Sequence, residues 1–312
     1  MNDVASALSA RFGADRVQAT ALLAPFTTFK VGGAADILFE SRTSEELVAA
    51  LMLAHANGMP VTMLGGGSNM LIGDKGIRGL VIRPRGGTVA AIGDSLVRAD
   101  ASVTINGLVR WTINHGYGGL EAWAGTPGTV GGAICGNAHW NSIGIGDLVE
   151  SVRLARRDGT LLQAPADRME FSYDDSRVKR TGEVVLWAAF RVQPGASPAR
   201  LRTVARESLA FRKKTQPLES PSAGCIFMNP APSRDRLPDG MPPSAGALVD
   251  GAGLKGVALG GARVSPAHAN FIINDGSATA ADIRALIERC RETVRDRYGI
   301  TLRDEIMCMG EF

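Results

Sequence analysis

The sequence has few of the residues that build metal centres, disulfide frameworks or membrane spans. Its four cysteines are Cys135, Cys225, Cys290 and Cys308. They show no short pair spacing, which argues against a zinc site or a structural disulfide in a reducing compartment. No apolar run is long enough to cross a bilayer, and the opening MNDVASALSARFG lacks the pattern of an export signal. We therefore expect a cytoplasmic protein with no metal and no membrane insertion.

Charge of one sign is also scarce. The formal net charge is +3 over 312 residues. This is too small and too dispersed for a general nucleic-acid binder, although the stretch 200–214 gathers six basic residues against one glutamate. We expect an anionic small ligand, no nucleic acid and a monomeric protein.

What the sequence has in excess is glycine, with 38 residues of this type. Many lie in two nearly uncharged stretches, LGGGSNML (64–71) and AGTPGTVGGAICGN (124–137). Glycine lets main-chain N–H groups approach a phosphate closely, because it has no Cβ and accepts positive φ. Neither stretch matches the common nucleotide-binding fingerprints. Together they would suit the pyrophosphate of a dinucleotide, although each alone is also typical of a plain tight turn.

Local patterns predict a mixture of helices and short strands. A capping box and an apolar face predict a helix over 43–57, and similar signals predict helices over about 104–115 and 279–298. The last of these places Cys290 in the core. A hairpin is expected over 149–162 and a strand over 183–192. The pattern indicates an α+β protein.

A chain of this length is expected to contain more than one hydrophobic core. The break QPGASP at 193–198 is the best candidate for a boundary between domains. The three segments that we expect are 1–83, 84–197 and 198–312.

A series of motifs carries a resemblance to a known family. In chain order they are TTFKVGGAADILFE, LGGGSNMLI, GTPGTVGGAICGNA, FSYDDSRVK, RKKTQP, SAGCIFMNP, AGLKGVALGGARVSPAHANFIIN and LRDEIMCMGEF. From about residue 23 to its C-terminus the chain resembles UDP-N-acetylenolpyruvoylglucosamine reductases (MurB). The short connection between YDDS and RKKTQP is similar to the shorter, second type of this family, which lacks an additional segment that caps the substrate.

The resemblance implies an α+β fold with two parts. One is a two-part FAD-binding domain of the MurB/vanillyl-alcohol-oxidase-like type, with subdomains 1–83 and 84–197. The other is a C-terminal α+β substrate-binding domain, 198–312, whose extreme C-terminus returns to the active site. The FAD-binding residues that it implies are Leu64, Gly65, Gly66, Gly67, Ser68, Asn69, Met70, Gly125, Thr126, Pro127, Gly128, Thr129, Gly131, Gly132 and Asn137.

The resemblance also implies a reaction. NADPH reduces non-covalently bound FAD, NADP leaves, and UDP-N-acetylenolpyruvoylglucosamine is then reduced to UDP-N-acetylmuramate, a step of peptidoglycan precursor synthesis that serves cell-wall biogenesis, cell shape and cell division. The implied substrate-binding residues are Tyr173, Ser176, Arg212, Asn229, His268 and Asn270. For His268 a purely structural role is the alternative.

Cys225 occupies the position at which the family has a serine that donates a proton to carbon. A thiol, with a reference pKa of about 8.5, can do this work if it stays protonated until the substrate enolate forms. A nearby carboxylate would raise the thiol pKa, and Glu305 matches the family's conserved terminal glutamate. The alternative is that Cys225 is simply a small buried apolar residue.

Two positions depart from the family pattern. The arginine of the Y-R-x-S motif is replaced by Asp174, so we hypothesise that Arg177 supplies the guanidinium for the substrate carboxylate. The lysine of F-K-N-P is replaced by Met228, and Arg212 or one of the lysines after it is expected to compensate. The alternatives are that Arg177 is a surface cation and that the basic cluster is a solvated helix face.

Three functions therefore stay open. The leading one is the reductase, with Cys225, Glu305 and Arg177 as catalytic residues. Another FAD-linked oxidoreductase on the same scaffold is the second, since a fold does not determine a function. The third is a catalytically degenerate paralogue that binds FAD or a UDP-sugar, which the changes at Asp174 and Met228 would favour and the retained Cys225 and Glu305 argue against.

Overall fold

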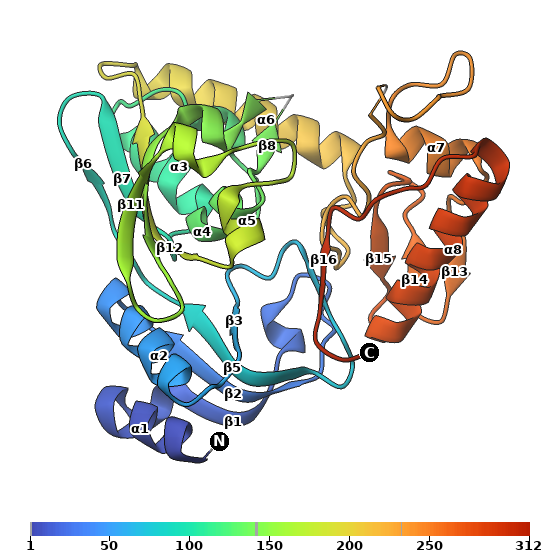
Figure 1. Ribbon diagram of the computed structural model, residues 1–312. Helices are drawn as coiled ribbons and strands as arrows, with labels where there is room; N and C mark the ends of the chain where they lie inside the picture. Colours follow the sequence, from blue (N-terminus) through green and yellow to red (C-terminus); the bar gives the residue numbers. More distant parts are fainter. Residues whose placement is uncertain (1, 141–142, 232) are drawn as a thin grey trace. The chain divides into compact units, whose positions relative to one another are not determined.

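The structure, a computed structural model, describes residues 2–140, 143–231 and 233–312 (Figure 1). The chain forms two units, each assembled from segments that are discontinuous in sequence. Unit 1 consists of Met1–Ala21, Ala35–Gly66 and Arg78–Phe211. Unit 2 consists of Leu22–Ala34, Gly67–Ile77 and Arg212–Phe312.

A four-stranded sheet with strand order β1-β2-β5-β3 belongs mainly to unit 1. Its elements and the helices beside it are α1 (Asn2–Phe12), β1 (Val17–Leu22), β2 (Ala34–Ser41), α2 (Ser44–Ala56), β3 (Val61–Met63) and β5 (Ile77–Pro84). Helix α2 starts after Thr43, whose side chain accepts a hydrogen bond from the Glu46 N–H, as the capping pattern predicts. Its apolar face packs into a core with α1 and the sheet.

A five-stranded antiparallel sheet with strand order β11-β10-β12-β7-β6 forms the rest of unit 1. Its strands are β6 (Val89–Ala91), β7 (Leu96–Asp100), β10 (Val149–Ala155), β11 (Leu161–Pro165) and β12 (Val184–Arg191), with a hairpin of β8 (His139–Trp140) and β9 (Ile143–Gly144) nearby in sequence. The α-helices are α3 (Ile105–Asn114), α4 (Val130–Cys135), α5 (Arg177–Thr181) and α6 (Pro198–Thr215). The predicted hairpin and following strand are β10, β11 and β12, so these predictions are confirmed.

Unit 2 has its own core around the longest predicted helix. Its elements are β4 (Met70–Ile72), α7 (Ala245–Gly251), β13 (Ala258–Leu259), β14 (Ala262–Val264), β15 (Ile272–Asn274), α8 (Ala280–Tyr298) and β16 (Met307–Met309). Strand β16 pairs with β4 in parallel, and β13, β14 and β15 form an antiparallel sheet. Helix α8 begins with the predicted capping box and ends at Gly299, which has a φ of 71°. Cys290 is buried in its apolar stripe, as predicted.

Short 3₁₀ helices connect several of these elements. They are η1 (Ala14–Arg16), η2 (Ala24–Phe26), η3 (Glu121–Trp123), η4 (Ile145–Leu148) and η5 (Ala166–Met169). The predicted break at 193–198 directly precedes α6, most of which belongs to unit 1. The division into three functional segments stays a prediction.

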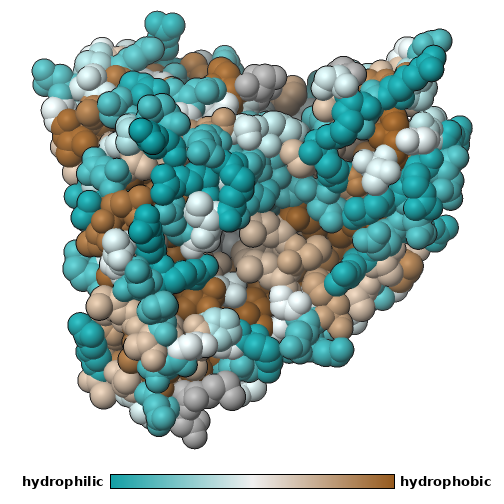
Figure 2. Space-filling model, in the orientation of Figure 1, coloured by the Kyte–Doolittle hydropathy of each residue, from teal (hydrophilic) through white to brown (hydrophobic). Residues whose placement is uncertain are grey.

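The surface seen in Figure 2 is mostly hydrophilic, with scattered hydrophobic patches. None of the helices in the described ranges combines the length and the apolar content needed to cross a bilayer.

One carboxylate joins distant parts of unit 2. Asp74 accepts hydrogen bonds from the Ala280 N–H (2.8 Å) and the Ala281 N–H (2.9 Å), which lie 206 and 207 residues away in the sequence. Within α8 itself these N–H groups of the first turn have no carbonyl to bind. A negative charge at a helix N-terminus is also favourable.

We expect Asp74→Ala to lower the free energy of unfolding by about 1–2 kcal/mol, because the first turn of α8 loses both acceptors. Urea unfolding followed by circular dichroism measures this change. Asp94→Ala, at an exposed loop aspartate, is the control and should have little effect. Equal midpoints for the two variants would contradict the assignment.

Candidate active site

The two glycine-rich loops contact each other inside unit 1. A Cβ placed on Gly66 would lie 2.6 Å from the Gly128 Cα, and one on Gly65 would lie 2.7 Å from the Thr129 Oγ1. At Gly66 the added Cβ would meet main-chain atoms of Gly128, so no side-chain movement could relieve the clash. The glycines of the first loop therefore permit the close approach of the second.

Main-chain hydrogen bonds hold the second loop in place. The Ile105 N–H donates to the Gly128 carbonyl (3.1 Å), and the Val130 N–H donates to the Val103 carbonyl (2.8 Å). The Asn106 side chain accepts from the Gly125 N–H at 2.8 Å. Sequence reasoning did not single out Asn106, although an asparagine in the first turn of a helix is a common partner for a neighbouring loop.

A pocket of about 630 Å³ opens beside these loops, and all of its lining belongs to unit 1. The lining residues are Gly65, Gly66, Arg83, Pro84, Arg85, Gly86, Gly87, Val89, Ser102, Val103, Thr104, Gly107, Trp111 and Thr129. The first turn of α3 contributes Thr104 and Gly107, and a helix N-terminus favours an anion. Glycine backbone and a helix N-terminus at one pocket provide the donors that a phosphate needs.

Arg85 adds positive charge to this pocket. Its side chain is exposed, and its guanidinium has no hydrogen-bond or ion-pair partner in the part of the chain that the structure describes. Arg83, which also lines the pocket, forms an ion pair with Glu40 at 2.6 Å. Sequence reasoning missed both arginines and Trp111; the available signal was the run RPRGG directly after the apolar stretch GLVI.

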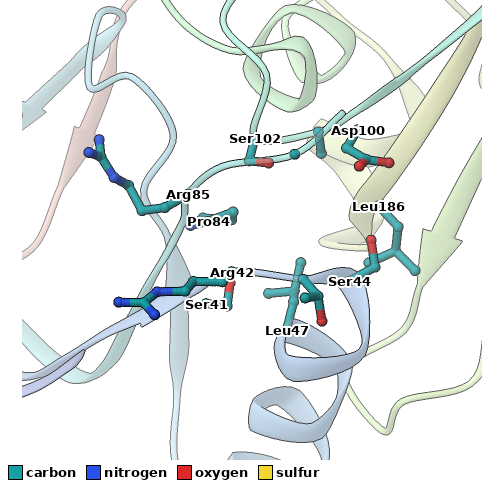
Figure 3. A pocket seen from close by; sticks show the side chains of 12 residues that line it. Ser41, Arg42, Ser44, Leu47, Pro84, Arg85, Asp100, Ser102 and Leu186 are labelled. Carbon is teal, nitrogen blue, oxygen red and sulfur yellow. The ribbon is translucent and has the colours of Figure 1, made fainter. Parts of the chain in front are cut away.

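A second, much smaller pocket shares Arg85 with the first (Figure 3). Its volume is about 20 Å³, enough for about one water molecule and far too small for a cofactor. Figure 3 shows the side chains of Arg42 and Arg85, at the ends of β2 and β5, extending in the same direction, away from Leu47. Arg42 forms an ion pair with Asp15 at 3.6 Å, and Asp100 also lines this pocket, so the charge here is mixed.

Other residues predicted to bind the cofactor lie outside this lining. Asn69 belongs to unit 2, where its side-chain Nδ2 donates to the Glu305 carbonyl (3.1 Å) and its main-chain carbonyl accepts from the Met307 N–H (3.0 Å). Asn137 is buried, donates to the Ser172 carbonyl (2.8 Å) and accepts from the Gly146 N–H (2.9 Å). Both carboxamides hold backbone in this structure.

The segment that departs from the family pattern is ordered by an ion pair. Asp174 is buried in the left-handed region, with a φ of 53°, which aspartate tolerates better than most residues. The Lys179 ammonium donates to the Asp174 carbonyl (2.8 Å) and to its Oδ2 (2.9 Å). Burial raises the pKa of Asp174, which the bond from Lys179 partly offsets. The Ser176 hydroxyl is fully buried and donates to the Cys135 carbonyl (2.8 Å).

Arg177 is engaged by a carboxylate of its own unit. Its Nε and Nη2 donate to the two Glu183 carboxylate oxygens at 2.8 Å and 2.9 Å, a bidentate pair. This bond lowers the pKa of Glu183. To bind a substrate carboxylate, the Arg177 guanidinium would have to bind it together with Glu183 or release Glu183 first.

Unit 2 brings Cys225 and Glu305 together through backbone pairing. The Glu305 N–H donates to the Ile226 carbonyl, and the Met228 N–H donates to the Arg303 carbonyl, both at 2.8 Å. Burial raises the pKa of the Cys225 thiol, and the negative charge of Glu305 raises it further. The thiol is therefore kept protonated beside a carboxylate.

Asn270 and His268 support the backbone next to Cys225. The Asn270 Oδ1 accepts from the Phe227 N–H (2.9 Å), and its Nδ2 donates to the Phe227 carbonyl (2.8 Å). The His268 Nδ1 accepts from the Asn270 N–H (3.2 Å), and burial lowers the pKa of this histidine. His268 is thus a neutral imidazole that supports the backbone at Asn270.

The remaining predicted substrate residues belong to both units. Asn229 is exposed and accepts from the Ala245 N–H (3.0 Å) at the start of α7. Arg212 is buried, and desolvation lowers its pKa. Tyr173 is exposed in unit 1, with its ring centroid 4.9 Å from that of His139.

Two family models match separate parts of the chain. Residues 35–164 match a family model described as an FAD binding domain, and residues 216–309 match one described as the C-terminal domain of UDP-N-acetylenolpyruvoylglucosamine reductase. Two curated UDP-N-acetylenolpyruvoylglucosamine reductases are similar. The protein from Trichormus variabilis is 37% identical over 95% of this chain and 87% of its own length. The protein from Geobacter metallireducens is 40% identical over 93% of this chain and 92% of its own.

A solved structure is similar along the whole chain. The UDP-N-acetylenolpyruvylglucosamine reductase (MurB) of Thermus caldophilus has a TM-score of 0.78 and 32% identity, over 95% of this chain and 99% of that one. An FAD-binding domain in one part of the chain and a reductase C-terminal domain in another, with whole-chain similarity to such reductases, define an FAD-dependent oxidoreductase of the predicted α+β class. The chain belongs to the UDP-N-acetylenolpyruvoylglucosamine reductase family.

We expect Gly66→Ala to reduce the FAD content of the purified protein, because its Cβ would force the two loops apart at a cost of about 1–3 kcal/mol. Visible flavin absorbance per protein and the free energy of unfolding measure the effect. Gly118→Ala is the control, since its Cβ would meet only ordinary contacts, at 3.4 Å and 3.5 Å. Full flavin content in the Gly66 variant would show that the approach of the loops does not matter for the cofactor.

Proposed function

We propose that this chain catalyses the NADPH-dependent reduction of UDP-N-acetylenolpyruvoylglucosamine to UDP-N-acetylmuramate. The observation that carries the proposal is the protonated Cys225 thiol held beside Glu305 in a chain that also has an FAD-binding domain. The curated relatives, which carry the name of this activity, support it. We further propose that the protein acts as a monomer in the cytoplasm, in peptidoglycan precursor synthesis and hence in cell shape and division.

The residues of unit 1 fit FAD. The contact between Gly66 and Gly128 leaves no room for a Cβ on Gly66, and the adjoining pocket combines glycine backbone, the first turn of α3 and the exposed side chain of Arg85. These groups would hold the phosphates of the dinucleotide. When bound, FAD supplies the hydride chemistry that links NADPH to the sugar substrate.

Cys225 is the proton donor in this proposal. Hydride addition to the terminal carbon of an enolpyruvyl ether leaves negative charge on the neighbouring carbon and on the carboxylate. The S–H proton of Cys225 moves to that neighbouring carbon, and the sulfur keeps the electron pair. Because burial and Glu305 raise the thiol pKa, the proton is present at neutral pH when it is needed.

Arg177 is proposed to bind the substrate carboxylate, with Glu183 orienting its guanidinium before the substrate arrives. Lys179 is a second candidate for this role because of one observation. Its ammonium gives two hydrogen bonds to Asp174 and keeps a third N–H without a partner in the described part of the chain. Asp174, where the family has arginine, would then position a lysine.

We expect Cys225→Ala to be reduced by NADPH at a normal rate but to lose reoxidation by the enolpyruvyl sugar by about 10²–10⁴-fold. Cys225→Ser should recover part of this loss, because a hydroxyl can carry the proton although it is a weaker acid. Anaerobic stopped-flow absorbance of the flavin measures both half-reactions. Cys308→Ala, at an exposed cysteine, is the control. Loss of the NADPH step in Cys225→Ala would mean that its defect is structural and would remove the assignment.

We expect Arg177→Ala to lower kcat/KM for the sugar roughly 10–150-fold, the effect of losing a hydrogen-bonded charge, and to leave flavin reduction by NADPH unchanged. Steady-state kinetics with the sugar as variable substrate measures it. Arg180→Ala, at an exposed arginine of the same helix, is the control. Normal turnover of Arg177→Ala together with a loss in Lys179→Met would transfer the role to Lys179.

A further inference from the structure

We infer that Trp111 binds the adenine ring of FAD and so makes the protein select FAD over FMN, which lacks the adenosine half. The inference rests on the FAD binding assigned in the proposed function. It adds a residue that lies outside the motifs that carry the family resemblance. It does not depend on which substrate the reduced flavin goes on to reduce.

Helix α3 connects the phosphate-binding end of the pocket to Trp111. Thr104 caps this helix by accepting a hydrogen bond from the Gly107 N–H (3.0 Å), and both residues line the pocket together with Trp111. Seven residues make almost two helical turns, so Trp111 lies on the same side of α3 as Thr104 and about 10 Å further along the axis. The pocket therefore extends along α3 from a helix N-terminus, which favours an anion, to an aromatic ring. In ADP one ribose joins the diphosphate to adenine over a comparable length.

The same pocket lacks the groups that the reacting flavin ring needs beside it. The proposed substrate ligands of unit 1 are Tyr173, Ser176 and Arg177, and none of them belongs to the lining in the described part of the chain. Because the isoalloxazine ring has to meet the substrate, the ring system at Trp111 is the one that does not react. Adenine is suited to this place, since nucleic-acid bases stack on aromatic side chains.

The indole of Trp111 is held in place by its own helix and the turn that follows. Its ring centroid lies 3.9 Å from that of His115, at an interplanar angle of 17°, and 5.9 Å from that of Tyr117, at 5°. The His115 N–H also donates to the Trp111 carbonyl (3.1 Å). Trp111 is half-buried, so part of it packs on the core of unit 1 and part lines the pocket. Binding therefore orders no flexible side chain at this end of the pocket, which lowers its entropic cost.

The first test compares two flavins on the full-length protein. Trp111→Ala should raise the Kd for FAD about tenfold, the effect of removing an aromatic side chain from a stacked base, and change the Kd for FMN less than about twofold. Trp111→Phe keeps a ring and should recover most of the affinity for FAD. Removal of the bound flavin followed by titration with FAD or FMN, read by flavin fluorescence, gives both constants.

Trp187→Ala is the matched control. Trp187 is a half-buried tryptophan of β12 in the same unit, with the Arg98 guanidinium carbon 4.9 Å from its ring centroid, and it is not part of the described pocket lining. Its replacement should leave both flavin constants unchanged. Equal weakening of FAD and FMN in Trp111→Ala would show that Trp111 supports the fold or contacts the flavin ring. That result would overturn the inference, and so would an unchanged Kd for FAD.

The second test uses ADP, which has the diphosphate and the adenosine but no flavin. ADP should compete with FAD for the wild type, and Trp111→Ala should raise its inhibition constant by about the same factor as the Kd for FAD. Failure of millimolar ADP to displace FAD from the wild type would overturn the inference, even where FMN binds too weakly to be measured. Neither test uses NADPH or the enolpyruvyl sugar. A wild type that binds FAD but is not reoxidised by the sugar would therefore remove the proposed reaction and leave this inference standing.

Discussion

A short antiparallel pairing of two chain segments determines the chemistry of unit 2. Residues 226–228 exchange main-chain hydrogen bonds with residues 303–305, and this register places Cys225 and Glu305 together. Neither residue is unusual alone, since a half-buried thiol is ordinarily inert and a carboxylate ordinarily ionised. Their proximity raises the pKa of the thiol beyond the effect of burial alone. The carboxamide of Asn270 holds the backbone of Phe227, the middle residue of this pairing, through two hydrogen bonds.

Unit 1 depends on a different constraint, which is steric. The backbone of the first loop can approach the Gly128 backbone only because Gly66 has no side chain. The second loop is anchored by main-chain bonds to the turn that precedes α3 and to the first residue of α3, so the helix N-terminus and the glycines line one pocket. A preformed set of donors of this kind binds a phosphate without first ordering flexible side chains.

Asp174 and Met228 are the two departures from the family pattern, and the contacts around Asp174 show how its charge is compensated. At position 174 the arginine is replaced by an acid, and the acid is neutralised by Lys179 within its own segment. Arg177 in turn is neutralised by Glu183. The structure gives no account of Met228 in place of lysine beyond its backbone bond to Arg303. The surroundings of positions 174–179 thus retain cations, but each one shares its charge with a carboxylate.

The sequence by itself determined the elements and the family. Helices α2 and α8 were predictable because their caps and apolar faces are local patterns, and the hairpin of β10 and β11 because alternation and a turn signal are local too. The glycine loops and the position of Cys225 could also be read from motifs. Tertiary structure alone decided the partners: Glu183 for Arg177, Phe227 for Asn270, and Arg85 and Trp111 as pocket lining. The Asn270 carboxamide bonds to a backbone 43 residues away, and no local pattern records which distant donor will satisfy a buried polar group.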